Sequence, residues 1–156
     1  MATQLTYNIL TVGGIGCLIF MLWILFFSYS GMAKAVRDRE GNFTGKLNWK
    51  SVLAFSIFIA FLFGIMHFGN VRLINHLGQD PGLWTLWLNS FGIFFTVHLF
   101  DLIVLDYLII VVWHPAFLKL PDTDYYRKLR PHLIGFFKGI PLGIASSFLT
   151  AVVFGF

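Results

Sequence analysis

The residues best suited to chemistry in this sequence lie close together in one apolar run. His98, Asp101 and Asp106 fall within Phe95 to Tyr107, where most other side chains are aliphatic or aromatic. A charge at the centre of a bilayer costs about 2.5 to 3.5 kcal/mol on insertion scales, so ionisable residues there are usually functional. His98 and Asp101 are three residues apart and can share a helix face. The carboxylate would orient the imidazole for proton relay or general base catalysis, and a neutral pair that serves packing is the alternative.

Asp106 is expected to pair with Lys138. On an α-helix, at about 100° per residue, Asp106 points about 140° away from Asp101, so one narrow face cannot hold His98 and both carboxylates. Lys138 lies about two turns inside the next apolar segment, at a depth that matches Asp106. An Asp106–Lys138 ion pair would either fix the register of two helices or exchange partners during transport. Alternatively, the Lys138 ammonium could extend to the membrane interface.

The other histidines are expected near the ends of apolar segments, where polar groups are inexpensive. His67 and His76 lie near one boundary, and His114 and His132 near the other. His114 and His132 are weak candidates for two ligands of a metal or haem site, but no further ligands with matching spacing accompany them. No metal site is therefore predicted, and the cofactor is left open.

Four apolar segments must position these side chains. The chain has 156 residues, of which 58% are hydrophobic and only 12% charged, whereas soluble domains have about 25% charged residues. A membrane span needs roughly 20 apolar residues, so four spans occupy nearly the whole length. They cover about 8–30, 51–69, 84–113 and 131–155. The predicted fold class is an all-α membrane protein, a single domain (1–156) forming an antiparallel four-helix transmembrane bundle.

Basic residues are concentrated in two connectors. Five Lys and Arg residues lie between Gly31 and Lys50 and four between Lys119 and Arg130, whereas the connector after the second span has only Arg72. The positive-inside rule then predicts cytoplasmic basic loops and both termini on the outer side. Contact with anionic lipid headgroups accounts for the net charge of +4, so no nucleic-acid partner is expected.

Small residues recur at every fourth position of the last segment. They are Gly135, Gly139, Gly143, Ser147, Ala151 and Gly155. Such a stripe lets another helix approach almost backbone to backbone, which predicts tight packing of the third and fourth spans. Pro141 should kink this helix in the middle of the stripe.

Two family likenesses bear on location and activity. Size and span number are similar to those of the small trimeric membrane glutathione-transferase and eicosanoid enzymes, but Ser51 to Gly69 lacks the Arg and Asn/Glu residues that mark that family's second helix. The run from His98 to Asp106, with the later Leu-Pro-Asp-Thr, resembles small bacterial membrane proteins. This likeness implies the bacterial inner membrane and no particular activity.

Three functions are compatible with these features. The favoured one is a homo-oligomeric transporter or channel with a protonatable site at His98 and Asp101, supported by Asp106 and Lys138. The second is a membrane-embedded enzyme for a lipid or other hydrophobic substrate, with His98 and Asp101 as acid and base. The third is an accessory subunit of a larger membrane complex that docks through the small-residue stripe.

Overall fold

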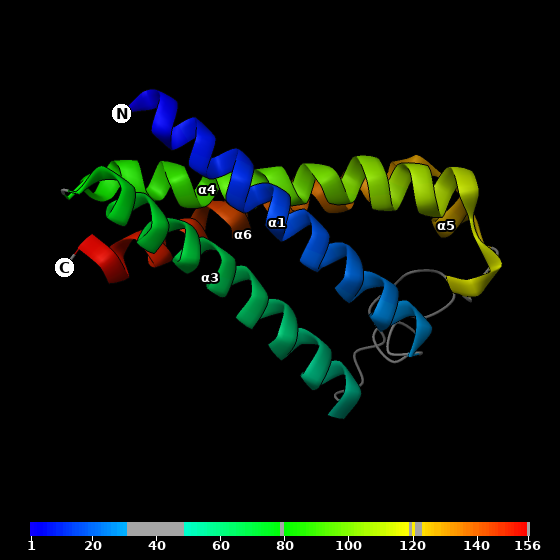
Figure 1. Ribbon diagram of the computed structural model, residues 1–156. Helices are drawn as coiled ribbons and strands as arrows, with labels where there is room; N and C mark the ends of the chain where they lie inside the picture. Colours follow the sequence, from blue (N-terminus) through cyan, green and yellow to red (C-terminus); the bar gives the residue numbers. More distant parts are fainter. Residues whose placement is uncertain (31–48, 79, 119, 121–122, 156) are drawn as a thin grey trace.

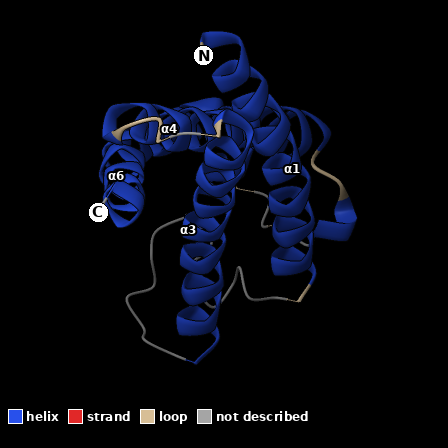
Figure 2. Cartoon of the chain, turned by 60° about the vertical axis from the view of Figure 1, so that its left-hand side comes forward, coloured by secondary structure: helices blue, strands red, loops and turns tan. Residues whose placement is uncertain are grey.

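The computed structural model describes the chain except residues 31–48, 79, 119, 121–122 and 156. Most of the first basic connector therefore lies outside the described residues. Helices are the regular secondary structure of the part that is described (Figure 2). Four of them are long and apolar enough to cross a membrane: Ala2–Tyr29, Trp49–Leu77, Leu83–Trp113 and Leu129–Val153. The prediction of an all-helical chain with four span-length helices is confirmed.

The helices extend beyond most of the predicted segments. Their bounds are α1 (Ala2–Tyr29), α3 (Trp49–Leu77), α4 (Leu83–Phe100), the π-helix η1 (Asp101–Trp113), the 3-10 helix η2 (Ala116–Leu118), α5 (Asp124–Arg127) and α6 (Leu129–Gly155). The difference is largest in α3, which continues past the predicted end at Gly69 to Leu77. Helical hydrogen bonds do not stop where the side chains become polar, so hydropathy underestimates helix length.

The third apolar segment changes its helical geometry halfway. α4 continues into η1 at Asp101, where each backbone N–H bonds to the carbonyl five residues earlier instead of four. The last of these bonds joins the His114 N–H to the Ile109 carbonyl at 2.8 Å. His114 then adopts a left-handed conformation with φ of 45°, and Pro115 prevents continuation of the helix.

α4 lies between α1 and α6, and α3 contacts all three (Figure 1). Glycines make these contacts close. A Cβ atom at Gly16 would lie 2.8 Å from Val97, one at Gly69 would lie 2.2 Å from Ile93, and one at Gly143 would lie 1.9 Å from Phe94. The absence of a side chain at these positions therefore lets the helix backbones approach one another.

The helices separate toward the end of η1. In Figure 1, α1 and α3 diverge from the line of α4 and η1. Within the described residues α3 contacts α1, α4 and α6 but does not contact η1. The core is packed where the helices are close, around Val12, Met66 and Ile93, each 0% exposed. The widening at the other end leaves space for a pocket.

Candidate functional site

Asp106 and His132 form a close pair of ionisable groups between η1 and α6. The Nδ1 atom of His132 in α6 lies 2.8 Å from the Oδ1 atom of Asp106 in η1. The His132 side chain is 4% exposed and the Asp106 side chain 22% exposed. The other ring nitrogen of His132, Nε2, is covered and has no hydrogen-bond partner in the described structure. A carboxylate that binds one imidazole nitrogen fixes the ring's orientation.

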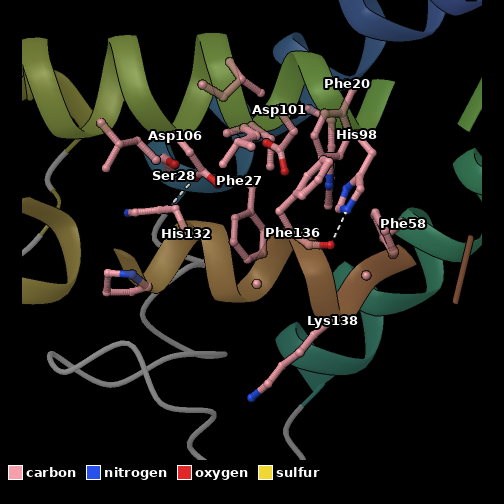
Figure 3. A pocket seen from close by; sticks show the side chains of 18 of the residues that line it. Phe20, Phe27, Ser28, Phe58, His98, Asp101, Asp106, His132, Phe136 and Lys138 are labelled. Atoms are coloured by element: carbon pink, nitrogen blue, oxygen red, sulfur yellow. Dashed lines mark hydrogen bonds and ion pairs between the residues drawn. The ribbon is translucent and has the colours of Figure 1, made fainter. Parts of the chain in front are cut away.

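This geometry corrects the predicted Asp106–Lys138 ion pair. Asp106 pairs with His132 instead, and Lys138 is exposed. Figure 3 shows the Lys138 side chain leaving α6 on the side away from Asp106. A match in predicted depth does not determine the direction in which a helical side chain points. His132, expected at the membrane boundary, is buried between the helices.

The π-helix changes which residues share a face. Asp101 and Asp106 both line one pocket, together with His98 (Figure 3). The α-helical angle of about 140° between the carboxylates would have separated them. Bonding from residue i to residue i+5 instead brings positions five apart onto neighbouring turns of one face. The π-helix therefore brings Asp101 and Asp106 closer in angle than α-helical spacing would, and all three residues line one cavity.

His98 is held by α6. Its ring stacks on Phe136 at a centroid distance of 4.5 Å and on Phe94 at 5.0 Å. Its Nε2 atom lies 2.9 Å from the Phe136 carbonyl oxygen. A carbonyl can only accept a hydrogen bond, so Nε2 carries a proton and donates it, and in the neutral ring Nδ1 is the acceptor. The contacts that hold His98 are therefore two aromatic rings and a backbone carbonyl.

The small-residue stripe makes this contact possible. A Cβ at Gly139 would lie 2.7 Å from the His98 ring, and Ser147 and Ala151 are fully buried. Gly135 differs, because nothing lies within 4 Å of its Cβ position. The stripe thus packs against α4 over part of its length, while Gly135 lies at the pocket.

A cavity of about 940 Å³ contains these ionisable groups in its wall. α1 and α3 contribute mainly aromatic and aliphatic side chains, η1 contributes both carboxylates, and α6 contributes His132 and Phe136. This volume is within the range of about 300–1,000 Å³ for small-molecule sites. The wall of this space therefore combines aromatic and aliphatic side chains with ionisable groups.

The two weak candidates for metal ligands, His114 and His132, are engaged in other bonds. The His114 Nδ1 atom lies 3.0 Å from the Ile110 carbonyl oxygen of its own helix, and His132 Nδ1 contacts Asp106. The described residues contain no group of three or more His, Cys, Asp and Glu side chains that could hold a metal ion.

A second polar cluster, which the sequence analysis did not identify, lies at the opposite end of the bundle. The Asn8 amide donates to the Gly69 carbonyl and to the Asn89 side chain, and Asn89 donates to Asn70, each at 2.9 Å. Arg72 donates to the Asn8 side-chain oxygen at 3.4 Å. Because Arg72 can only donate, it fixes the amide orientation of Asn8 and hence of the two asparagines that follow.

This amide cluster joins three helices in an almost dry environment. Asn8 of α1 is 4% exposed, and Asn70 of α3 and Asn89 of α4 are 0% exposed. The sequence signal for this cluster was three asparagines in otherwise apolar segments. Nothing in their spacing indicates that they meet.

Fold and site together define the class: a helical protein with four helices that are long and apolar enough to cross a membrane, with ionisable groups between them. Neither a family model, nor a curated protein, nor a solved structure matches the chain. The chemistry of the pocket is therefore the guide to function.

Proposed function

We propose that this protein is a small membrane carrier that binds its substrate in the pocket and couples binding to proton exchange at Asp106 and His132. The observation that carries this proposal is their 2.8 Å contact in the wall of a cavity of about 940 Å³. Histidine gains and loses a proton near neutral pH, and ionisable groups within spans commonly form proton relays. His98 and Asp101 line the same cavity and supply further proton-binding groups.

The proposed topology is an antiparallel bundle in the bacterial inner membrane, with the termini outside and the basic loops cytoplasmic. The pocket would then lie in the cytoplasmic half. Its lining includes Ser28 near the end of α1, Ser51 near the start of α3 and Pro131 near the start of α6, all close to the basic connectors. The amide cluster and the packed core close the opposite half. A site accessible from one side and closed on the other is one state of an alternating-access cycle.

One chain supplies a cavity of ligand size, so substrate binding does not require a second copy. Homo-oligomerisation, predicted to provide room for a pathway, is retained as a separate part of the proposal. The molar mass of the detergent-solubilised protein, measured by light scattering after size-exclusion chromatography, tests it directly.

The first functional experiment measures proton entry into liposomes that hold a pH-sensitive dye and a potassium diffusion potential. We expect proton flux through the wild type to exceed that of empty liposomes. Asp106→Asn keeps the shape of the side chain but removes its charge, and should reduce flux to the level of empty liposomes. Asp124→Asn is the matched control, because Asp124 is an exposed carboxylate paired with Lys128 outside the pocket.

Each variant is first compared with the wild type by circular dichroism and size-exclusion chromatography. Equal flux through the wild type and a folded Asp106→Asn variant would contradict proton exchange at this pair. His98→Ala and Asp101→Asn then show whether the other groups in the pocket belong to the same pathway.

A membrane-embedded enzyme for a hydrophobic substrate is the second candidate. It is favoured by one observation, the Asp106 carboxylate bound to His132 Nδ1, which is the arrangement of a carboxylate-oriented general base. His132 therefore replaces His98 as the favoured base. Incubation of the purified protein with bacterial lipid extract, followed by mass spectrometry, tests this function. A lipid product formed by the wild type and absent with His132→Ala would support the enzyme.

A further inference from the structure

We infer that the pocket binds a hydrophobic organic cation, which exchanges with one proton of the Asp106–His132 pair. This inference rests on the proposed carrier function and names its substrate class. The argument combines the charges in the cavity wall, its aromatic lining and the unpaired nitrogen of His132.

The charges that face the cavity favour a cationic ligand. The titratable side chains among the described lining residues are His98 of α4, Asp101 and Asp106 of η1, Tyr125 and Tyr126 of α5, and His132 and Lys138 of α6. The lining residues of α1 and α3 are apolar, aromatic or serine. Lys138 is exposed, and Figure 3 shows its side chain directed away from the carboxylates. Asp106 thus places a carboxylate beside the cavity, while the ammonium group on its edge points elsewhere (Figure 3).

Aromatic rings surround the same space. The lining includes Phe20, Trp23 and Phe27 of α1, Phe55 and Phe58 of α3, and Phe136 of α6. Aromatic faces attract cations through their quadrupole, and cages of such rings recognise quaternary ammonium groups. Aromatic walls also bind the hydrophobic part of a ligand. A cation that carries apolar groups satisfies both features, whereas a small hydrated ion would satisfy only the carboxylates.

The Asp106–His132 pair provides the exchange. In its protonated form, the pair is a carboxylate and an imidazolium, which donates its Nδ1 proton to Asp106 and carries a second proton on Nε2. When the ligand cation contacts the Asp106 carboxylate, it replaces the charge of this second proton. The Nε2 proton leaves to water, the Nδ1 proton stays between His132 and Asp106, and no covalent bond in the ligand changes. His132 is then neutral, with an Nε2 atom that has no hydrogen-bond partner in the described structure.

The test uses two probes of the same shape and opposite charge, tetraphenylphosphonium and tetraphenylborate. Binding to the purified protein in detergent is measured by calorimetry, with a titration into empty micelles subtracted. We expect tetraphenylphosphonium to bind to the wild type more tightly than tetraphenylborate by about tenfold or more, because an adjacent opposite charge in a partly dry site is worth at least this factor. Asp106→Asn should remove this preference, and Lys138→Gln, the matched control, should preserve it.

Proton release is followed in the same titration with a pH indicator in weak buffer. Tetraphenylphosphonium should release protons from the wild type, and its affinity should rise as the pH rises because proton and cation compete. His132→Gln should keep the charge preference and lose the proton release. These measurements on the wild type do not depend on whether an Asp106 variant folds.

Two outcomes would overturn the inference. Tetraphenylborate binding as tightly as tetraphenylphosphonium would exclude a cationic substrate class, while wild-type proton flux that depends on Asp106 in liposomes would still support the carrier. Tetraphenylphosphonium binding without proton release and without pH dependence would exclude the exchange step. Failure of the proposed function is seen separately, as flux that does not depend on Asp106.

Discussion

Replacement of Gly143 by alanine is expected to destabilise the protein strongly. The new Cβ atom would lie 1.9 Å from Cε1 of Phe94 and 2.3 Å from its Cδ1, far inside van der Waals contact. The Phe94 ring is 6% exposed and stacks on Phe91 at 6.3 Å and on His98 at 5.0 Å, so it cannot move without disturbing them. Overpacking of this kind typically costs about 1–3 kcal/mol, and the severe overlap places Gly143→Ala near the upper end.

Gly135→Ala is the matched control on the same stripe. Nothing lies within 4 Å of its Cβ position, so the substitution creates no overlap. Alanine also loses less backbone conformational entropy than glycine when a helix folds, which favours alanine by about 0.5–1 kcal/mol. Gly135→Ala should therefore keep or slightly raise the melting temperature.

Thermal unfolding in detergent, followed by circular dichroism, measures both variants. For a chain of this size, a change of 1 kcal/mol in the free energy of unfolding shifts the melting temperature by about 2–4 °C. We therefore expect Gly143→Ala to melt about 6–12 °C below the wild type. Equal melting temperatures for the two alanine variants would refute the close approach of α6 to α4 at Phe94.

Three further outcomes are expected. Asn89→Ala should lower the free energy of unfolding by about 1–3 kcal/mol in the same melting assay, because its buried partners lose hydrogen bonds. Asn75→Ala, at an exposed position, is the control. Equal stability of the two variants would contradict the amide cluster. Asp106→Ala should destabilise by about 1–3 kcal/mol because it leaves the buried His132 without its partner, and an unchanged melting curve would argue against the pair. Cys17, the only cysteine, is 8% exposed and should react with a maleimide dye only when the protein is heated toward unfolding; rapid labelling at room temperature would contradict its packing.

The helical class was predictable because hydropathy is a local property. Backbone polar groups inside a bilayer must be satisfied within the segment, so apolar runs of this length are expected to be helices. The predicted boundaries were less accurate, since α3 and α1 continue into more polar sequence, to Leu77 and from Ala2.

The candidate site was predictable in part. Composition indicated that His98, Asp101 and Asp106 belong to an apolar helix, and all three line one cavity. The angular argument assumed α-helical spacing throughout Leu83–Trp113, whereas Asp101–Trp113 is a π-helix. Periodicity in the sequence does not reveal where a helix changes from one hydrogen-bond pattern to the other.

The sequence by itself determined that this chain forms four long apolar helices and that ionisable residues lie within them, because both properties depend on each segment alone. Only the tertiary structure decided that Asp106 pairs with His132 rather than Lys138, and that Asn8, Asn70 and Asn89 meet at the other end. These pairings depend on where two helices cross and which side of each faces the other. That information arises from the packing of glycines against side chains of other helices and from the π-helix, neither of which can be read from the hydropathy of one segment.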